Sequence, residues 1–198
     1  MTLLVVGLVL FLGIHLIRVL VPGFRTAMIE KMGKPAWTAV YSIASVVGLV
    51  VLAYGFGAAR SEDWGMLYNP PVWTSHLAVT LMLIATICLV AGFLPAGYIA
   101  TKTKHPMVLS VKIWALSHLL ANGEVYSVLL FAAFLAWGVI MRIMLKRRER
   151  AGEIVRRPFV SGLYDIVAIV VGAAVWWAMI WKIHLWLIGV APMPQLFS

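Results

Sequence analysis

The stretch AWTAVYSIASVVGLVVLAYGFGAA, residues 36–59, contains 24 consecutive residues without a charged side chain. An α-helix rises about 1.5 Å per residue, so this run is long enough to cross the roughly 30 Å hydrocarbon core of a bilayer. The rest of the chain has the same character, since 63% of its 198 residues are hydrophobic and only 12% are charged. A soluble core of this length cannot hide so much apolar surface, and the composition therefore predicts an integral membrane protein.

Apolar runs on both sides of this stretch predict an all-α, polytopic membrane bundle of about six transmembrane helices. The expected spans lie at about residues 3–21, 36–59, 72–98, 107–121, 125–145 and 162–190. The fourth is short, whereas the sixth is long enough to tilt or bend. Because no stretch between spans could form a core of its own, we expect a single transmembrane domain over residues 1–198.

Basic residues alternate between the expected loops, and this alternation predicts the orientation. The loops after the first, third and fifth spans carry the basic clusters: Arg25, Lys31 and Lys34, then Lys102 and Lys104, then KRRERAGEIVRR at 146–157. The positive-inside rule places these loops in the cytoplasm and both termini on the outer side, which in a bacterial inner membrane is the periplasm. The net charge of +9 is then explained by orientation and contact with anionic lipid, and no nucleic-acid partner is expected.

Histidines are the residues that could carry chemistry inside the bilayer, where ionisable groups are costly and therefore informative. Four of the five lie within the expected spans: His15, His76, His118 and His184. Imidazoles from two facing helices could hold a haem in a bundle core, or each could bond a polar group of a neighbouring helix. With one cysteine and no carboxylate at a span centre, haem is a better candidate than copper or zinc.

Residues on the same helix faces as His15 and His118 are further candidates for binding. Arg18 shares a helix face with His15, where it could hold a haem propionate or reach the cytoplasmic surface. In the fourth span, a stripe with a spacing of four residues could be a binding wall or a helix contact; it comprises Ser110, Trp114, His118 and Asn122.

The depth of each histidine leaves the pairing open. His118 lies about three residues from the outer end of its span, whereas His15 lies about six residues, or roughly 9 Å, from the cytoplasmic end of its own. His76, near the outer start of the third span, is the depth-matched alternative to His15. His184, late in the sixth span, is a weaker one.

Three segments make the chain recognisable: GIHLIRVLVPGFR at 13–25, KHPMVLSVKIWALSHLLANGE at 104–124 and HLWLIGVAP at 184–192. Together they resemble the NnrU family of membrane proteins over essentially the whole chain. That family is associated with nitrite and nitric oxide reduction in bacterial denitrification and is related to 15-cis-zeta-carotene isomerase, a membrane enzyme with haem b. The resemblance implies that His15 and His118 are the axial haem ligands, because they match the isomerase's two histidines. Ala115 stands where the isomerase has a cysteine that can replace the second histidine as a ligand when the redox state changes.

The resemblance implies a haem b protein of the inner membrane that is linked to nitrite and nitric oxide reduction. One alternative is a haem-dependent cis–trans isomerase of a lipid-soluble polyene such as zeta-carotene. Another is a non-catalytic assembly factor or accessory subunit, with a respiratory complex or a second copy of the chain as partner.

Overall fold

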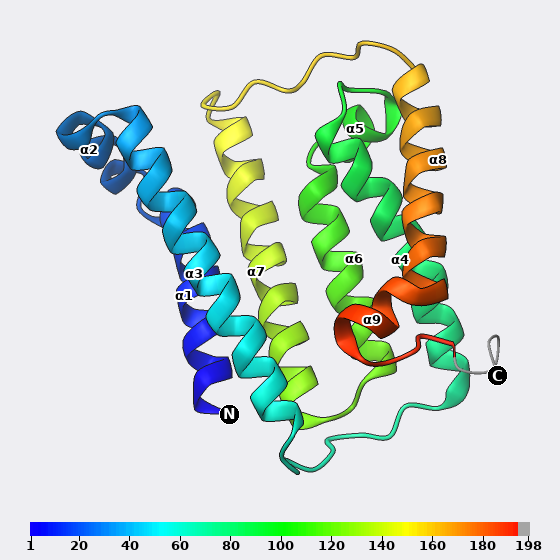
Figure 1. Cartoon of the computed structure of the whole chain (residues 1–198). Helices are drawn as coiled ribbons and strands as arrows, with labels where there is room; N and C mark the ends of the chain where they lie inside the picture. Colours follow the sequence, from blue (N-terminus) through cyan, green and yellow to red (C-terminus); the bar gives the residue numbers. More distant parts are fainter. Residues whose placement is uncertain (194–198) are drawn as a thin grey trace.

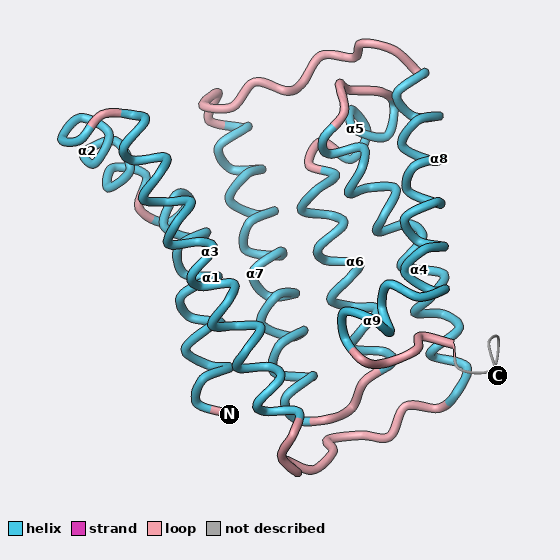
Figure 2. Tube along the Cα trace, viewed as in Figure 1, coloured by secondary structure: helices cyan, strands magenta, loops and turns pink. Residues whose placement is uncertain are grey.

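The protein is all-helical in the computed structural model, which describes residues 1–193 apart from the side chain of Arg18 (Figures 1 and 2). This confirms the predicted fold class. The helical elements are α1 (Thr2–Leu20), α2 (Pro22–Met32), α3 (Lys34–Arg60), α4 (Val72–Phe93), α5 (Tyr98–Thr103), α6 (Pro106–Ala121), α7 (Val125–Arg150), α8 (Leu163–Ala178), the π-helical η1 (Met179–Ile183) and α9 (His184–Ile188).

Proline residues set several of these boundaries. Pro22 and Pro106 occupy the first positions of α2 and α6, where a missing N–H costs no helical hydrogen bond. The third apolar run was expected to continue to residue 98, but α4 ends at Phe93. Pro95 lies two residues later and has no N–H with which to extend the helix.

Four helical segments are long and apolar enough to cross a membrane alone: α3, α4, α7 and the segment Leu163–Ile188, which comprises α8, η1 and α9. Helix α1 forms a fifth candidate only together with α2, which departs from it at an angle of 82°. Helix α6 has 16 residues, or about 24 Å, which is less than the roughly 30 Å of a bilayer core. The protein is therefore a membrane protein with four candidate spans, or five if the bent pair counts as one, and the expected count of six stays a prediction.

The helices pack as a row in the order α3, α1, α7, α6, α4, α8, each against the next (Figure 1). One end of this row carries α2, α5, the end of α7 and the start of α8, whereas the N-terminus, the 61–71 loop and α9 lie at the other. The row separates α1 from α6 by placing α7 between them.

The pair α1 and α3 is held by close contact between backbones. A Cβ added at Gly55 would lie 2.5 Å from the backbone nitrogen of Leu4, and one at Gly7 would lie 2.4 Å from the Cα of Leu52. Both leucines are buried in the main hydrophobic cluster. Since lipid tails are as apolar as leucine, such van der Waals contact between small residues is a principal force for helix association in a bilayer.

Helix α4 is joined to both its neighbours by close packing and by hydrogen bonds. A Cβ at Gly172 of α8 would lie 2.7 Å from the Cα of Ile87. Trp176 Nε1 donates to the carbonyl of Val79 at 2.8 Å. On the other side, Ser110 Oγ of α6 donates to the carbonyl of Ala85 at 2.7 Å. Interhelical bonds of this kind fix the relative position of helices where no water competes.

The contact between α1 and α3 predicts a matched pair of effects. We expect Gly55→Ala to destabilise the protein by about 1–3 kcal/mol, because the new methyl group would overlap the α1 backbone. Gly57→Ala, on the same helix with nothing within 4 Å of the added Cβ, should stay within about 1 kcal/mol of the parent or gain from helix propensity. Unfolding in detergent measures both. Equal stability of the two variants would contradict close backbone packing as the cause.

Candidate functional site

The structure brings His118 together with His184. Their ring centroids lie 6.4 Å apart and their planes are inclined by 23°. His76, expected as the depth-matched partner, is exposed on α4. His184, the weakest of the partners considered from the sequence, is therefore the histidine whose ring contacts His118.

His184 reaches His118 because the last apolar segment is not a continuous α-helix. The five residues of η1 are π-helical, a wider turn that changes the helical phase of the residues after it and is often found at functional sites. After η1, α9 leaves the axis of α8 to the side and lies against the lower part of α6 (Figure 1). Arg60, at the end of α3, donates to the carbonyl of Ile188 and so ties α9 to a distant helix. Gly189 then ends α9 in the left-handed conformation, with φ of 76°.

Three histidines are oriented in the same way, since each bonds a backbone carbonyl through Nδ1. The pairs are His15 with Phe11 at 2.6 Å, His118 with Trp114 at 2.8 Å, and His184 with Val190 at 2.7 Å. A carbonyl only accepts, so Nδ1 carries the proton and donates, and the neutral ring keeps a lone pair on Nε2. Metal-binding histidines commonly make this bond, which fixes the tautomer and the direction of the ring.

The spacing of His118 and His184 fits two ligands of one metal centre. A metal–nitrogen bond of about 2.0 Å, plus about 1.1 Å from the nitrogen to the ring centre, would put the centres of two imidazoles on opposite sides of one metal about 6.2 Å apart. The observed separation is 6.4 Å. Among residues 1–193, no group of three or more His, Cys, Asp or Glu side chains could hold a metal ion. A site at this pair would therefore take its protein ligands from the two imidazoles alone.

Aromatic side chains surround His118. Its ring stacks on Phe131 of α7 with centroids 4.6 Å apart, and the Trp114 ring lies 5.3 Å away. Trp114 also packs edge-on against Phe131 and Phe134. These rings give His118 an apolar environment on the α7 side.

His15 lies in a separate aromatic cluster on the other side of α7. Its ring is 4.5 Å from Phe11, 5.8 Å from Tyr41 and 6.3 Å from Trp137. No ring contact joins His15 to His118 in the part of the chain that the structure describes. Their pairing as ligands stays a prediction, as does the role of Arg18, whose side chain lies outside the described part.

Hydrogen bonds hold the end of α6 that carries His118. The side chain and the backbone N–H of Asn122 donate to the His118 carbonyl at 2.8 and 2.9 Å. The Tyr68 hydroxyl, from the 61–71 loop, bonds the carbonyls of Leu119 and Asn122. Burial, and then the negative charge of Glu124, raise the pKa of Tyr68 above its ordinary value, so the hydroxyl stays protonated as a donor.

The polar stripe of α6 divides between the two roles considered for it. Ser110 bonds α4, and Asn122 caps the end of its own helix, so both serve structure. His118 differs, because its Nδ1 is bonded within the helix while its ring faces His184. The stripe thus serves mostly structure, with one candidate ligand, His118, near the C-terminal end of α6.

One acid at a span end has a structural explanation. The Asp165 carboxylate, in the first turn of α8, accepts hydrogen bonds from the N–H groups of Tyr98 and Ile99 at 2.7 and 2.9 Å. It thereby caps the start of α5, where helical N–H groups lack partners of their own. Asp165 is therefore a structural rather than a chemical residue.

These features define a class: a helical, polytopic membrane protein with two facing imidazoles near one end of the bundle. A family model described as NnrU protein matches residues 3–192, and the chain belongs to the NnrU family. This confirms the resemblance seen in the sequence. No curated protein and no solved structure matched the chain.

The contacts of Tyr68 predict how firmly the end of α6 is held. Tyr68→Phe should lower stability by about 0.5–1.5 kcal/mol, because helix carbonyls lose a donor, and should speed hydrogen exchange near Asn122. The raised pKa means that the donor is present below its ordinary value of 10.0 and is lost only as the pH rises through the folded-state value. The difference between variant and parent should therefore be constant from about pH 6 to 9. A difference that disappears within that range would contradict this assignment.

Proposed function

We propose that this chain is a bacterial inner-membrane protein of the NnrU type that binds haem b through two imidazoles and is linked to nitrite and nitric oxide reduction. The single observation that carries the proposal is the approach of His118 and His184, at 6.4 Å between ring centroids. His118 and His184 would hold the haem, which would supply one-electron transfer when bound. The link to nitrogen oxides rests on the resemblance to the family.

The chain's own residues have separable tasks in this proposal. The carbonyls of Trp114 and Val190 fix the two imidazoles through Nδ1, so that Nε2 is the atom available to a metal. Phe131 and Trp114 line the apolar side of His118 and exclude water from it. Arg60 is a positioning residue, since it holds α9, and with it His184, against the bundle.

Ala115 bears on the isomerase alternative. It is completely buried and its methyl side chain cannot bind a metal, so it offers no substitute for the His118 imidazole as a ligand. The proposal therefore assigns a fixed pair of ligands and a redox role, and not ligand exchange of the kind that the related isomerase implies.

Histidine variants test the ligand assignment. We expect protein expressed with ample haem to show a Soret band, and His118→Ala or His184→Ala to reduce bound haem by at least about ten-fold. His76→Ala is the matched control, because its ring is exposed on α4 and should leave the spectrum unchanged. Haem content per protein, measured as the pyridine haemochrome, gives the result.

The same series separates the competing pairs. Loss of haem in His15→Ala with retention in His184→Ala would overturn the assignment of His184 and favour the pair implied by the resemblance. A colourless parent protein after expression with ample haem would overturn haem binding itself.

We also propose that the chain crosses the membrane six times with both termini in the periplasm. The support is that the basic loops share one end of the bundle with α2 and α5, while the N-terminus lies at the other (Figure 1). Alkaline phosphatase fused after residue 66 should be active, since that loop would be periplasmic, and fusion after residue 152 should be inactive. Activity after residue 152 would contradict the topology.

A further inference from the structure

The end of the bundle opposite to His118 contains a pocket that the proposed haem site does not use. It has a volume of about 440 Å³ and lies where the residue after α5, the last turns of α7 and the loop after α7 meet. Its lining residues are Lys104, Lys146, Glu149, Arg150, Ile154 and Arg156.

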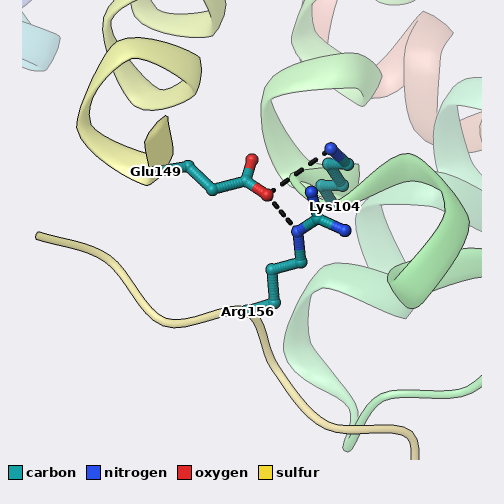
Figure 3. A network of polar contacts seen from close by, with 3 residues as sticks. All are labelled: Lys104, Glu149 and Arg156. Carbon is teal, nitrogen blue, oxygen red and sulfur yellow. Dashed lines mark hydrogen bonds and ion pairs between the residues drawn. The ribbon is translucent and has the colours of Figure 1, made fainter. Parts of the chain in front are cut away.

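This pocket carries an excess of positive charge. Four of the lining side chains are cationic and one is anionic, which leaves a formal net charge of +3. Glu149 bonds Lys104 Nζ at 3.4 Å and also pairs with Arg156, so it joins α7 to the chain after α5 and to the loop (Figure 3). Its side chain is only 10% exposed, and it cannot neutralise the remaining cations. Lys146 and Arg150, four residues apart on one face of α7, are left without a carboxylate partner among the described residues.

A second, smaller pocket belongs to the same basic region, because its residues Thr103 and His105 flank Lys104 of the first pocket. It has a volume of about 130 Å³ and is lined by Thr103, His105, Val108, Leu109, Lys112 and Arg142. His105 Nε2 is buried and has no hydrogen-bond partner in the described part of the chain. Burial, and then the positive charge of Arg142, lower the pKa of His105, while Glu149 opposes this in part. The smaller pocket therefore also contains a polar atom, His105 Nε2, that could bind a ligand group.

The loop that closes the larger pocket is anchored. Arg157, next to Arg156, donates to the carbonyls of Gly92 and Leu94 at the end of α4. The Val160 N–H donates to the Ala96 carbonyl at 2.8 Å. These bonds fix the loop relative to α4, so the backbone that carries Arg156 is anchored beside the pocket.

The position along α7 indicates where a ligand would come from. Lys146 comes directly after the apolar run 125–145, which contains a single basic residue, Arg142. The pocket therefore begins where the hydrocarbon core is expected to end, at the level of lipid headgroups. Anionic headgroups are concentrated there and are attracted by clustered Lys and Arg side chains.

We propose that this pocket binds the phosphate group of an anionic phospholipid. Phosphate matches the cations Lys146, Arg150 and Arg156, because arginine can bind it with two parallel hydrogen bonds and lysine as a point charge. The volume accommodates a whole headgroup and not only the phosphate. Glu149 sets the affinity by neutralising part of the positive charge.

The test titrates purified full-length protein with short-chain phosphatidylglycerol, with phosphatidylcholine and pyrophosphate in parallel arms, and counts bound molecules by native mass spectrometry. Arg150→Gln should weaken phosphatidylglycerol binding about five-fold. Arg147→Gln is the matched control, since it removes the same charge from the same helix outside the pocket, and should change binding by less than about two-fold. Glu149→Gln should tighten binding, because it removes the only negative charge in the lining.

Each other outcome counts against the proposal. Equal weakening by Arg150→Gln and Arg147→Gln would show general surface attraction and not a pocket. If Glu149→Gln elutes from a size-exclusion column as the parent does but binds phosphatidylglycerol no more tightly, the net positive charge of the pocket does not set the affinity, and the proposal is overturned. Retention of pyrophosphate without phosphatidylglycerol would overturn the lipid as the source of the phosphate.

Discussion

Close contact between helix backbones is the constraint on which the rest of the structure depends. In a bilayer no water drives apolar surfaces together, so helices associate largely through close packing where small residues let them approach, and through interhelical hydrogen bonds. Gly7 and Gly55 allow this between α1 and α3, and Gly172 allows it between α4 and α8. The resulting order of helices places α7 between α1 and α6 and thereby decides which side chains can meet.

The ends of helices are completed by side chains from distant parts of the chain. Asp165 caps α5, Arg157 bonds the end of α4, Tyr68 bonds the end of α6 and Arg60 bonds the end of α9. Each bond satisfies backbone groups that a helix leaves without partners. The bonds of Tyr68 to α6 and of Arg60 to α9 also hold the two helices that carry His118 and His184. The same hydrogen bonds that complete these helices therefore help to position the candidate site.

Much of the fold could be predicted because apolar runs and breaks are local properties. The run at residues 36–59 lies within α3, and the run at residues 125–145 lies within α7, which continues through the basic segment to Arg150. The first run ends close to where it was expected, but the helix α2 and its 82° angle to α1 were not predicted. The early end of α4 was not predicted either, because Pro95 lies within a run that hydropathy alone treats as continuous.

The sequence by itself determined that this is a helical membrane protein of the NnrU family, that its charge is sorted between loops, and that His118 is a candidate ligand. These conclusions come from composition, spacing and motif, which need no knowledge of neighbours. Only the tertiary structure decided that His184 meets His118 while His15 lies beyond α7. His184 is directed by the π-helical turn of η1, which alters the helical phase of the residues after it. The position of His15 is set by the order of the helices, which depends on packing between residues far apart in the chain.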